Sequence, residues 1–139
     1  MPIKISLPDH SQYFKGLLLL IRKDRIVHDQ EKQLMLRIGK IMGFEKEFCE
    51  NSINEILENE YIVDEYPQFS NQEIAKCFIK DGLHLAMVDN NLDDSELEWL
   101  STTAELHGIS AAWFNTELTS RKKLSNVSAV TLEAEQFQI

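Results

Sequence analysis

Seven oxygen-bearing side chains lie in two short stretches whose spacing suits either cation binding or helix capping. The second stretch carries five of them and the first carries two: Asp89, Asn91, Asp93, Asp94 and Glu96, then Asp24 and Glu31. Carboxylate and amide oxygens are the ligands that Ca²⁺ takes in proteins. The same oxygens accept hydrogen bonds from the open N–H groups at the start of a helix. Both interpretations stay open on the sequence.

The surrounding residues distinguish the two stretches from each other and from an EF-hand. No base stands between residues 89 and 96, whereas Arg22, Lys23 and Arg25 surround Asp24 and disfavour a cation there. If Asp89 is position 5 of an EF-hand loop, positions 1 and 3 fall on Leu85 and Met87, which have no oxygen ligand. A true EF-hand is therefore excluded, and a weak divalent-cation site remains a hypothesis for the second stretch.

No other group of residues has the spacing of a known catalytic or metal centre. The histidines form neither a His-x-x-x-His nor a His-Glu-x-x-His pair: His10, His28, His84 and His107. The sequence also lacks a Cys-x-x-Cys pair, a glycine-rich phosphate loop and a Gly-x-Ser-x-Gly turn. We therefore expect a protein that is not an enzyme and requires no cofactor, with a divalent cation as the one candidate.

The elements that must position these groups are helices. Apolar residues repeat every three or four positions along almost the whole chain, and no segment alternates as a strand does. The stripes predict six helices and a shorter C-terminal one, over residues 9–24, 29–42, 45–58, 71–89, 94–107, 110–122 and 128–136. The longest connection, 59–69, contains Pro67 among aromatic residues, so we expect it to pack against the body.

Start and stop signals support these boundaries. Ser70 opens a Ser-Asn-Gln-Glu capping box, and Asp93 opens a second one with Glu96. Gly43 and Gly108 stand where the C-terminal glycines of helices belong.

The chain repeats itself with an offset of 65 residues. The shared pattern is Asp-x-x-Val/Leu-x-Asp-x-Glu, from Asp24 to Glu31 and from Asp89 to Glu96, and both copies end in a helix followed by glycine. Units of residues 13–44 and 78–109 are each predicted to be a helix, a short turn and a second helix. The expected fold is an all-α, compact single-domain bundle of about six to seven helices over residues 1–139, with its core at about 10–122. Two pseudo-twofold-related helix-turn-helix units build it.

The net charge of the chain disfavours some classes of binding partner. The 139 residues carry 14 Lys and Arg against 23 Asp and Glu, a net charge of −9, which disfavours nucleic acid and anionic membranes as partners. Residues 45–65 hold eight acids and one base. This segment favours either a cationic protein partner or a solvated face.

The sequence also predicts a cytoplasmic location. The N-terminus lacks a signal-peptide pattern, and the apolar run Leu17–Ile21 is far shorter than the roughly 20 residues of a membrane span, so we expect no direct membrane insertion. Cys49 and Cys77 lie in predicted helices and are expected to be buried thiols in a reducing compartment.

The doubled acidic turn resembles the TerB-like family, which includes tellurite-resistance proteins and N-terminal domains of some membrane-anchored J-domain co-chaperones. The resemblance covers about residues 10–118 and matches the family pattern Asp-Gly-x-[Ile/Val]-x-x-x-Glu, although Arg25 and Asn90 replace its glycine. It implies an acidic, cytoplasmic, all-helical domain linked to metal or chemical stress. No catalytic residue follows from it.

Two functional hypotheses come out of the sequence. The first is a non-enzymatic module that binds a partner protein, with weak divalent-cation binding in the second turn. The alternative is a purely structural interaction domain whose turn carboxylates only cap helices and bind no metal.

Overall fold

The computed structural model describes residues 3–24, 29–58, 65–87, 93–123 and 133–138, and its longer elements are all helices. Six α-helices occupy these residues: α1 (Leu7–Ile21), α2 (Asp29–Ile41), α3 (Lys46–Glu58), α4 (Gln72–Met87), α5 (Asp94–Leu106) and α6 (Ala111–Lys123). Two short 3₁₀ helices, η1 (Arg22–Asp24) and η2 (Glu133–Gln136), accompany them. The predicted all-α bundle is confirmed. No helix within the described ranges is long and apolar enough to cross a membrane.

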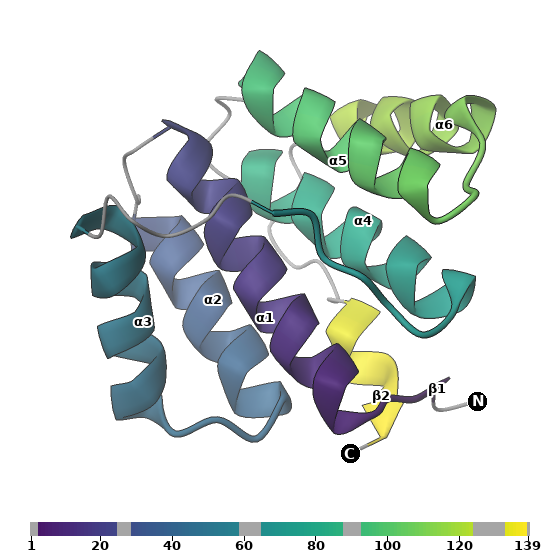
Figure 1. Cartoon of the computed structure of the whole chain (residues 1–139). Coiled ribbons are helices and arrows are strands. Elements are labelled where there is room, and N and C mark those ends of the chain that lie inside the picture. The colour runs from purple at the N-terminus through teal and green to yellow at the C-terminus, as the bar shows by residue number, and fades with distance from the viewer. Residues whose placement is uncertain (1–2, 25–28, 59–64, 88–92, 124–132, 139) are drawn as a thin grey trace.

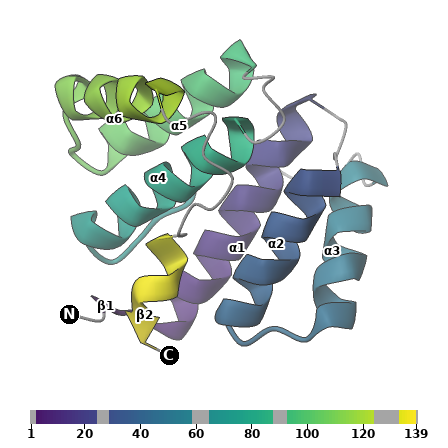
Figure 2. The ribbon, with the colours of Figure 1, turned by 180° about the vertical axis from the view of Figure 1, so that it is seen from behind.

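Helix α1 occupies the middle of the bundle (Figure 1). Helices α2 and α3 lie on one side of it, and α4, α5 and α6 lie on the other. Viewed from behind, η2 lies beside α4 and near the N-terminus (Figure 2). The strand β2 (Phe137–Gln138) follows η2 directly and pairs in parallel with β1 (Ile3–Lys4).

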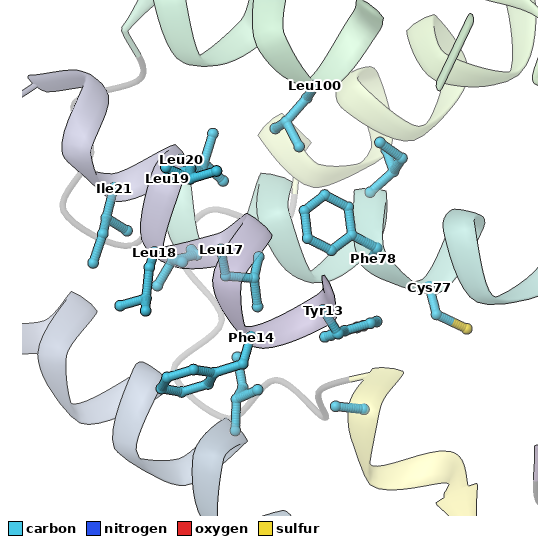
Figure 3. Close-up of a cluster of buried hydrophobic side chains, with 14 of the residues drawn as sticks. Tyr13, Phe14, Leu17, Leu18, Leu19, Leu20, Ile21, Cys77, Phe78 and Leu100 are labelled. Atoms are coloured by element: carbon cyan, nitrogen blue, oxygen red, sulfur yellow. The ribbon is translucent and has the colours of Figure 1, made fainter. Parts of the chain in front are cut away.

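The central position of α1 follows from its composition. From Tyr13 to Ile21 every residue except Lys15 is buried, including the whole run Leu17–Ile21. A helix that is apolar on all sides must be covered on all sides. Figure 3 shows these side chains pointing outward from α1 in different directions, with Phe78 of α4 and Leu100 of α5 across from them.

The repeat predicted from the sequence is present in the helix ends. Gly43 and Gly108 have φ angles of +85° and +73°, the left-handed conformation that glycine adopts at little cost. The next residues, Phe44 and Ile109, donate their N–H groups to the carbonyls of Gly39 and Ala104 at 2.9 and 3.0 Å. Each pair is separated by 65 positions, so both units end their second helix with the same hydrogen-bonded turn.

Two equivalent residues also touch each other. Tyr13 of α1 and Phe78 of α4 are 65 positions apart, and their rings meet edge to face with centroids 5.4 Å apart. In a two-fold arrangement, a residue can contact its own equivalent only near the axis. The crossing of α1 and α4 therefore lies where a pseudo-twofold axis between the units is expected.

The predicted C-terminal helix over 128–136 is wrong in the part that is described. Residues 133–136 form the short 3₁₀ helix η2, followed by the two-residue strand β2, and residues 124–132 lie outside the described ranges. The physical reason is the side chain of Asp81 on α4. It accepts the N–H groups of Glu133 at 2.6 Å and Ala134 at 2.9 Å, which fixes the start of η2 against α4.

Asp81 is the centre of a buried C-terminal clasp. Its carboxylate is 1% exposed and also accepts the hydroxyl of Tyr13 at 2.6 Å. Ala134 is fully buried, and Glu133 lies 3.8 Å from Arg121 and 4.0 Å from Lys80. Burial raises the pKa of Asp81 to about 6, although the hydrogen bonds from Tyr13 and the two backbone N–H groups act in the opposite direction.

The pKa of Asp81 gives a testable pH dependence. Because this pKa is about 6 in the folded chain and about 3.9 in an unfolded one, the native state holds a proton that the unfolded state has lost between these values. The contribution of Asp81 to stability is therefore fully present below about pH 4 and falls by about 3 kcal/mol in total as the pH rises from about 4 to about 6. Asp81→Asn does not titrate. Urea unfolding of both proteins from pH 4 to 8 should show the stability of the wild type declining relative to Asp81→Asn; a constant difference would contradict the assignment.

Candidate functional site

The second acidic turn is a helix cap in the part that is described. Asp93 accepts the N–H and the hydroxyl of Ser95, both at 2.9 Å, and Glu96 accepts the N–H of Asp93 at 3.4 Å. This is the predicted capping box at the start of α5, and it is confirmed. The N–H of Ser95 is the main cause that holds the pKa of Asp93 below its usual value.

The two repeat glutamates are buried to the same extent. Glu31 in the first turn of α2 and Glu96 in the first turn of α5 are each 1% exposed. Carboxylates are rarely buried to this degree unless something compensates their charge, and the N-terminal end of a helix provides part of that compensation. The repeat in the sequence therefore identifies two glutamates that are equally buried in the structure, although the sequence did not predict their burial.

The remaining candidate ligands are not gathered into one site by the described residues. Asp94 is exposed on α5, and Asp24 ends η1. Asp89 and Asn91 lie outside the described residues. Within residues that are described, no three or more His, Cys, Asp or Glu side chains come together as a group that could hold a metal ion. The structure therefore shows the capping role of Asp93 and Glu96, and the cation site stays a prediction.

A second polar constellation, absent from the sequence-based prediction, binds the segment 65–70. We call this segment the strap, because it runs in extended form across α1 before α4 begins (Figure 1). Three successive N–H groups of the strap, at residues 68, 69 and 70, donate to side chains of the helices beneath. The acceptors are Gln12 Oε1 at 3.2 Å, His107 Nε2 at 3.0 Å and Asp9 Oδ1 at 2.9 Å.

Aromatic contacts hold the same segment from below. The ring of Tyr66 stacks on Trp99 with centroids 5.8 Å apart. The ring of Phe69 lies 5.1 Å from Phe78 and 5.8 Å from Tyr13. The prediction that this connection packs against the body is thus confirmed for its described part.

The path of the strap depends on a glycine in α1. A Cβ atom at Gly16 would stand 2.8 Å from the ring of Phe78 and 3.0 Å from Cγ of Pro67. Contacts below 3.0 Å require neighbouring atoms to move, and an aromatic ring in a packed core cannot move cheaply. Gly16 therefore allows α4 and the strap to approach α1 together.

Asp9 anchors the end of the strap. Its carboxylate accepts the hydroxyl of Ser70 at 2.6 Å and that of Ser6 at 2.8 Å, as well as the Ser70 N–H, and the side chain is 3% exposed. Burial raises the pKa of Asp9, but the hydrogen bonds from Ser70 and Ser6 outweigh it and hold the pKa below its usual value. The predicted capping role of Ser70 is wrong for this reason: Asn71 accepts the N–H of Ile74 at 2.9 Å instead.

Sequence reasoning missed Asp9, Asp81 and His107 because their partners are far away in the chain. The contact between Asp9 and Ser70 spans 61 positions, and the contact between Asp81 and Glu133 spans 52. The only local signal was Pro67 among aromatic residues, which predicted packing of the loop without naming its partners. Comparison of the chain with protein-family models, curated proteins and solved structures finds no match, so the TerB-like resemblance stays a prediction.

The capping box can be tested independently of any metal. Asp93→Ala removes the oxygen that accepts the Ser95 N–H, and we expect a melting temperature lower by about 3–5 °C, whereas Asp93→Asn keeps an acceptor and should change it little. Thermal unfolding with and without a chelator measures both effects. If chelation lowers the melting temperature of the wild type but not that of Asp93→Ala, a bound cation and not the cap determines the stability of this turn.

Proposed function

We propose that this protein is a non-enzymatic, cytoplasmic interaction module of the TerB-like type, which binds a basic segment of a partner protein in a metal or chemical stress response. The single observation that supports a partner surface is the outer side of α3. This helix lies at the edge of the bundle and packs only its inner side against α1 and α2 (Figure 1), through Cys49, Ile53 and Ile56.

The outer side of α3 combines an apolar anchor with acidic groups. Phe48 is 52% exposed, and Glu55 follows it two helical turns later on the same face. The ring of Phe48 is held by Phe44 at 5.4 Å and Phe14 at 6.4 Å between centroids, so it is presented in a fixed position. An exposed, pre-positioned aromatic ring beside carboxylates suits a partner that offers an apolar side chain flanked by Lys or Arg.

A second candidate function is weak binding of a divalent cation at residues 89–96. It is favoured by the buried carboxylates Glu31 and Glu96, which occupy equivalent positions in the two units. The capping box at Asp93 supports the alternative, in which these acids serve only the helix. The two functions do not exclude each other, because α3 (residues 46–58) lies outside the repeat unit 78–109 that contains the second turn.

The partner surface is tested by comparing three immobilised proteins: the wild type, Phe48→Ala and Leu7→Ala. Leu7 is 77% exposed at the start of α1 and serves as a matched control for the loss of an exposed apolar side chain. We expect a partner that the wild type and Leu7→Ala retain and Phe48→Ala loses, with about 30-fold weaker binding once the partner is purified. A partner retained equally by all three would contradict the assignment of the α3 surface.

The cation is tested by calorimetric titration with calcium, magnesium, manganese and zinc. We expect heat from the wild type and none from a variant that combines Asp89→Asn with Glu96→Gln, because two oxygen ligands are weakened together. Circular dichroism of the variant controls for folding. Absence of heat in both proteins would leave only the partner-binding proposal.

A further inference from the structure

The ring of His107 connects the strap to α5 through both of its nitrogens. Nδ1 lies 2.8 Å from the carbonyl oxygen of Thr103 one turn earlier in α5. Nε2 lies 3.0 Å from the backbone nitrogen of Phe69, whose N–H points to it. A carbonyl oxygen can only accept and a backbone N–H can only donate, so Nδ1 carries the proton and Nε2 carries the lone pair. This geometry requires the neutral imidazole.

Protonation of His107 is incompatible with this arrangement. In the imidazolium both nitrogens are donors, so Nε2–H would face the N–H of Phe69 and no hydrogen bond could form between them. We propose that the strap is a pH-sensitive latch, which neutral His107 holds closed and which opens when the imidazole takes up a proton. This inference concerns a different part of the molecule from the α3 surface and does not depend on the proposed function.

The charged groups around the ring do not replace the lost bond. The helices that pack with the strap and with His107 carry Asp9 on α1, Glu73 on α4 and Glu105 on α5, and the strap itself carries Glu65, which pairs with Lys15 at 3.0 Å. Asp9 is already engaged by Ser6 and Ser70, and Glu73 and Glu105 are exposed to water. Among the residues that the structure describes, His107 forms no ion pair. A proton on Nε2 therefore gains no carboxylate partner in the closed arrangement.

The latch opens from one end. The anchor between Asp9 and Ser70 survives mild acid, since its hydrogen bonds hold the pKa of Asp9 below its usual value. The strap therefore stays fixed at Ser70, while the N–H of Phe69 loses its acceptor on His107. Opening then breaks the bond from the Gln68 N–H to Gln12 and removes Tyr66 from Trp99 and Phe69 from Tyr13 and Phe78. It uncovers an aromatic surface to which α1, α4 and α5 each contribute one ring.

The proposal is tested by amide hydrogen exchange of the full chain, with exchange rates converted to protection factors at about pH 7.5 and about pH 5. In the wild type, the protection factor of Phe69 should fall about ten- to a hundredfold at the lower pH, which corresponds to the loss of one hydrogen bond that leaves a donor unpaired. The protection factor of Ser70 should change little, because Asp9 stays ionised. NMR titration of the His107 ring protons shows in the same samples when the ring becomes protonated.

His107→Gln provides the matched control. Its side-chain oxygen can accept the N–H of Phe69 at either pH, so its Phe69 protection should not depend on pH. An unchanged amide spectrum away from the strap shows that the variant is folded. Three results would overturn the proposal: Phe69 stays protected while His107 is protonated, protection falls equally in wild type and variant, or His107 remains neutral at pH 5. If the variant fails to fold, the first and third results in the wild type still decide.

Discussion

The near-complete burial of α1 from Tyr13 to Ile21 is the constraint on which the rest of the structure depends. Its run Leu17–Ile21 faces in every direction, and a single neighbouring helix could cover only one of its faces. The second helices of both units cannot complete the cover, because each also packs against its own neighbour. The strap and the C-terminal 3₁₀ helix also pack against this core: Pro67 and Ala134 are buried, and the ring of Phe69 packs against Tyr13 and Phe78.

The strap and the start of η2 have backbone N–H groups that the interior of an α-helix would satisfy internally, and buried carboxylates provide the missing acceptors. Asp9 takes the N–H and hydroxyl of Ser70, and Asp81 takes the N–H groups of Glu133 and Ala134. The two acids differ in which effect on the carboxylate pKa is larger, burial or hydrogen bonding. Hydrogen bonds dominate at Asp9 and lower its pKa, whereas burial dominates at Asp81 and raises its pKa to about 6.

The same distinction separates what the sequence could predict from what it could not. The helices, the Asp93 capping box and the glycines that end two helices are predicted from residues only three to four positions apart, and the structure confirms these predictions. The anchors at Asp9, Asp81 and His107 act over 38 to 61 positions, and nothing in the local pattern identifies their partners. The predicted C-terminal helix was wrong because local periodicity carries no information about a carboxylate on α4. For the candidate cation site, the sequence correctly predicted that Asp93 and Glu96 form a capping box.

The repeat relates the positions at which the strap and η2 contact the helices. Gly16 of α1 and Asp81 of α4 are equivalent positions, 65 residues apart, beside the contact of Tyr13 with Phe78. Each contacts one segment outside the α-helices: Gly16 makes room for Pro67 of the strap, and Asp81 accepts the N–H groups of Glu133 and Ala134 in η2. Gly16, which has no side chain, and Asp81, which has a charged one, thus both allow a covering segment to pack at the crossing of α1 and α4. Because a two-fold axis would pass near this crossing, both segments reach the core at corresponding places, and the two units differ there in how they hold the chain that covers them.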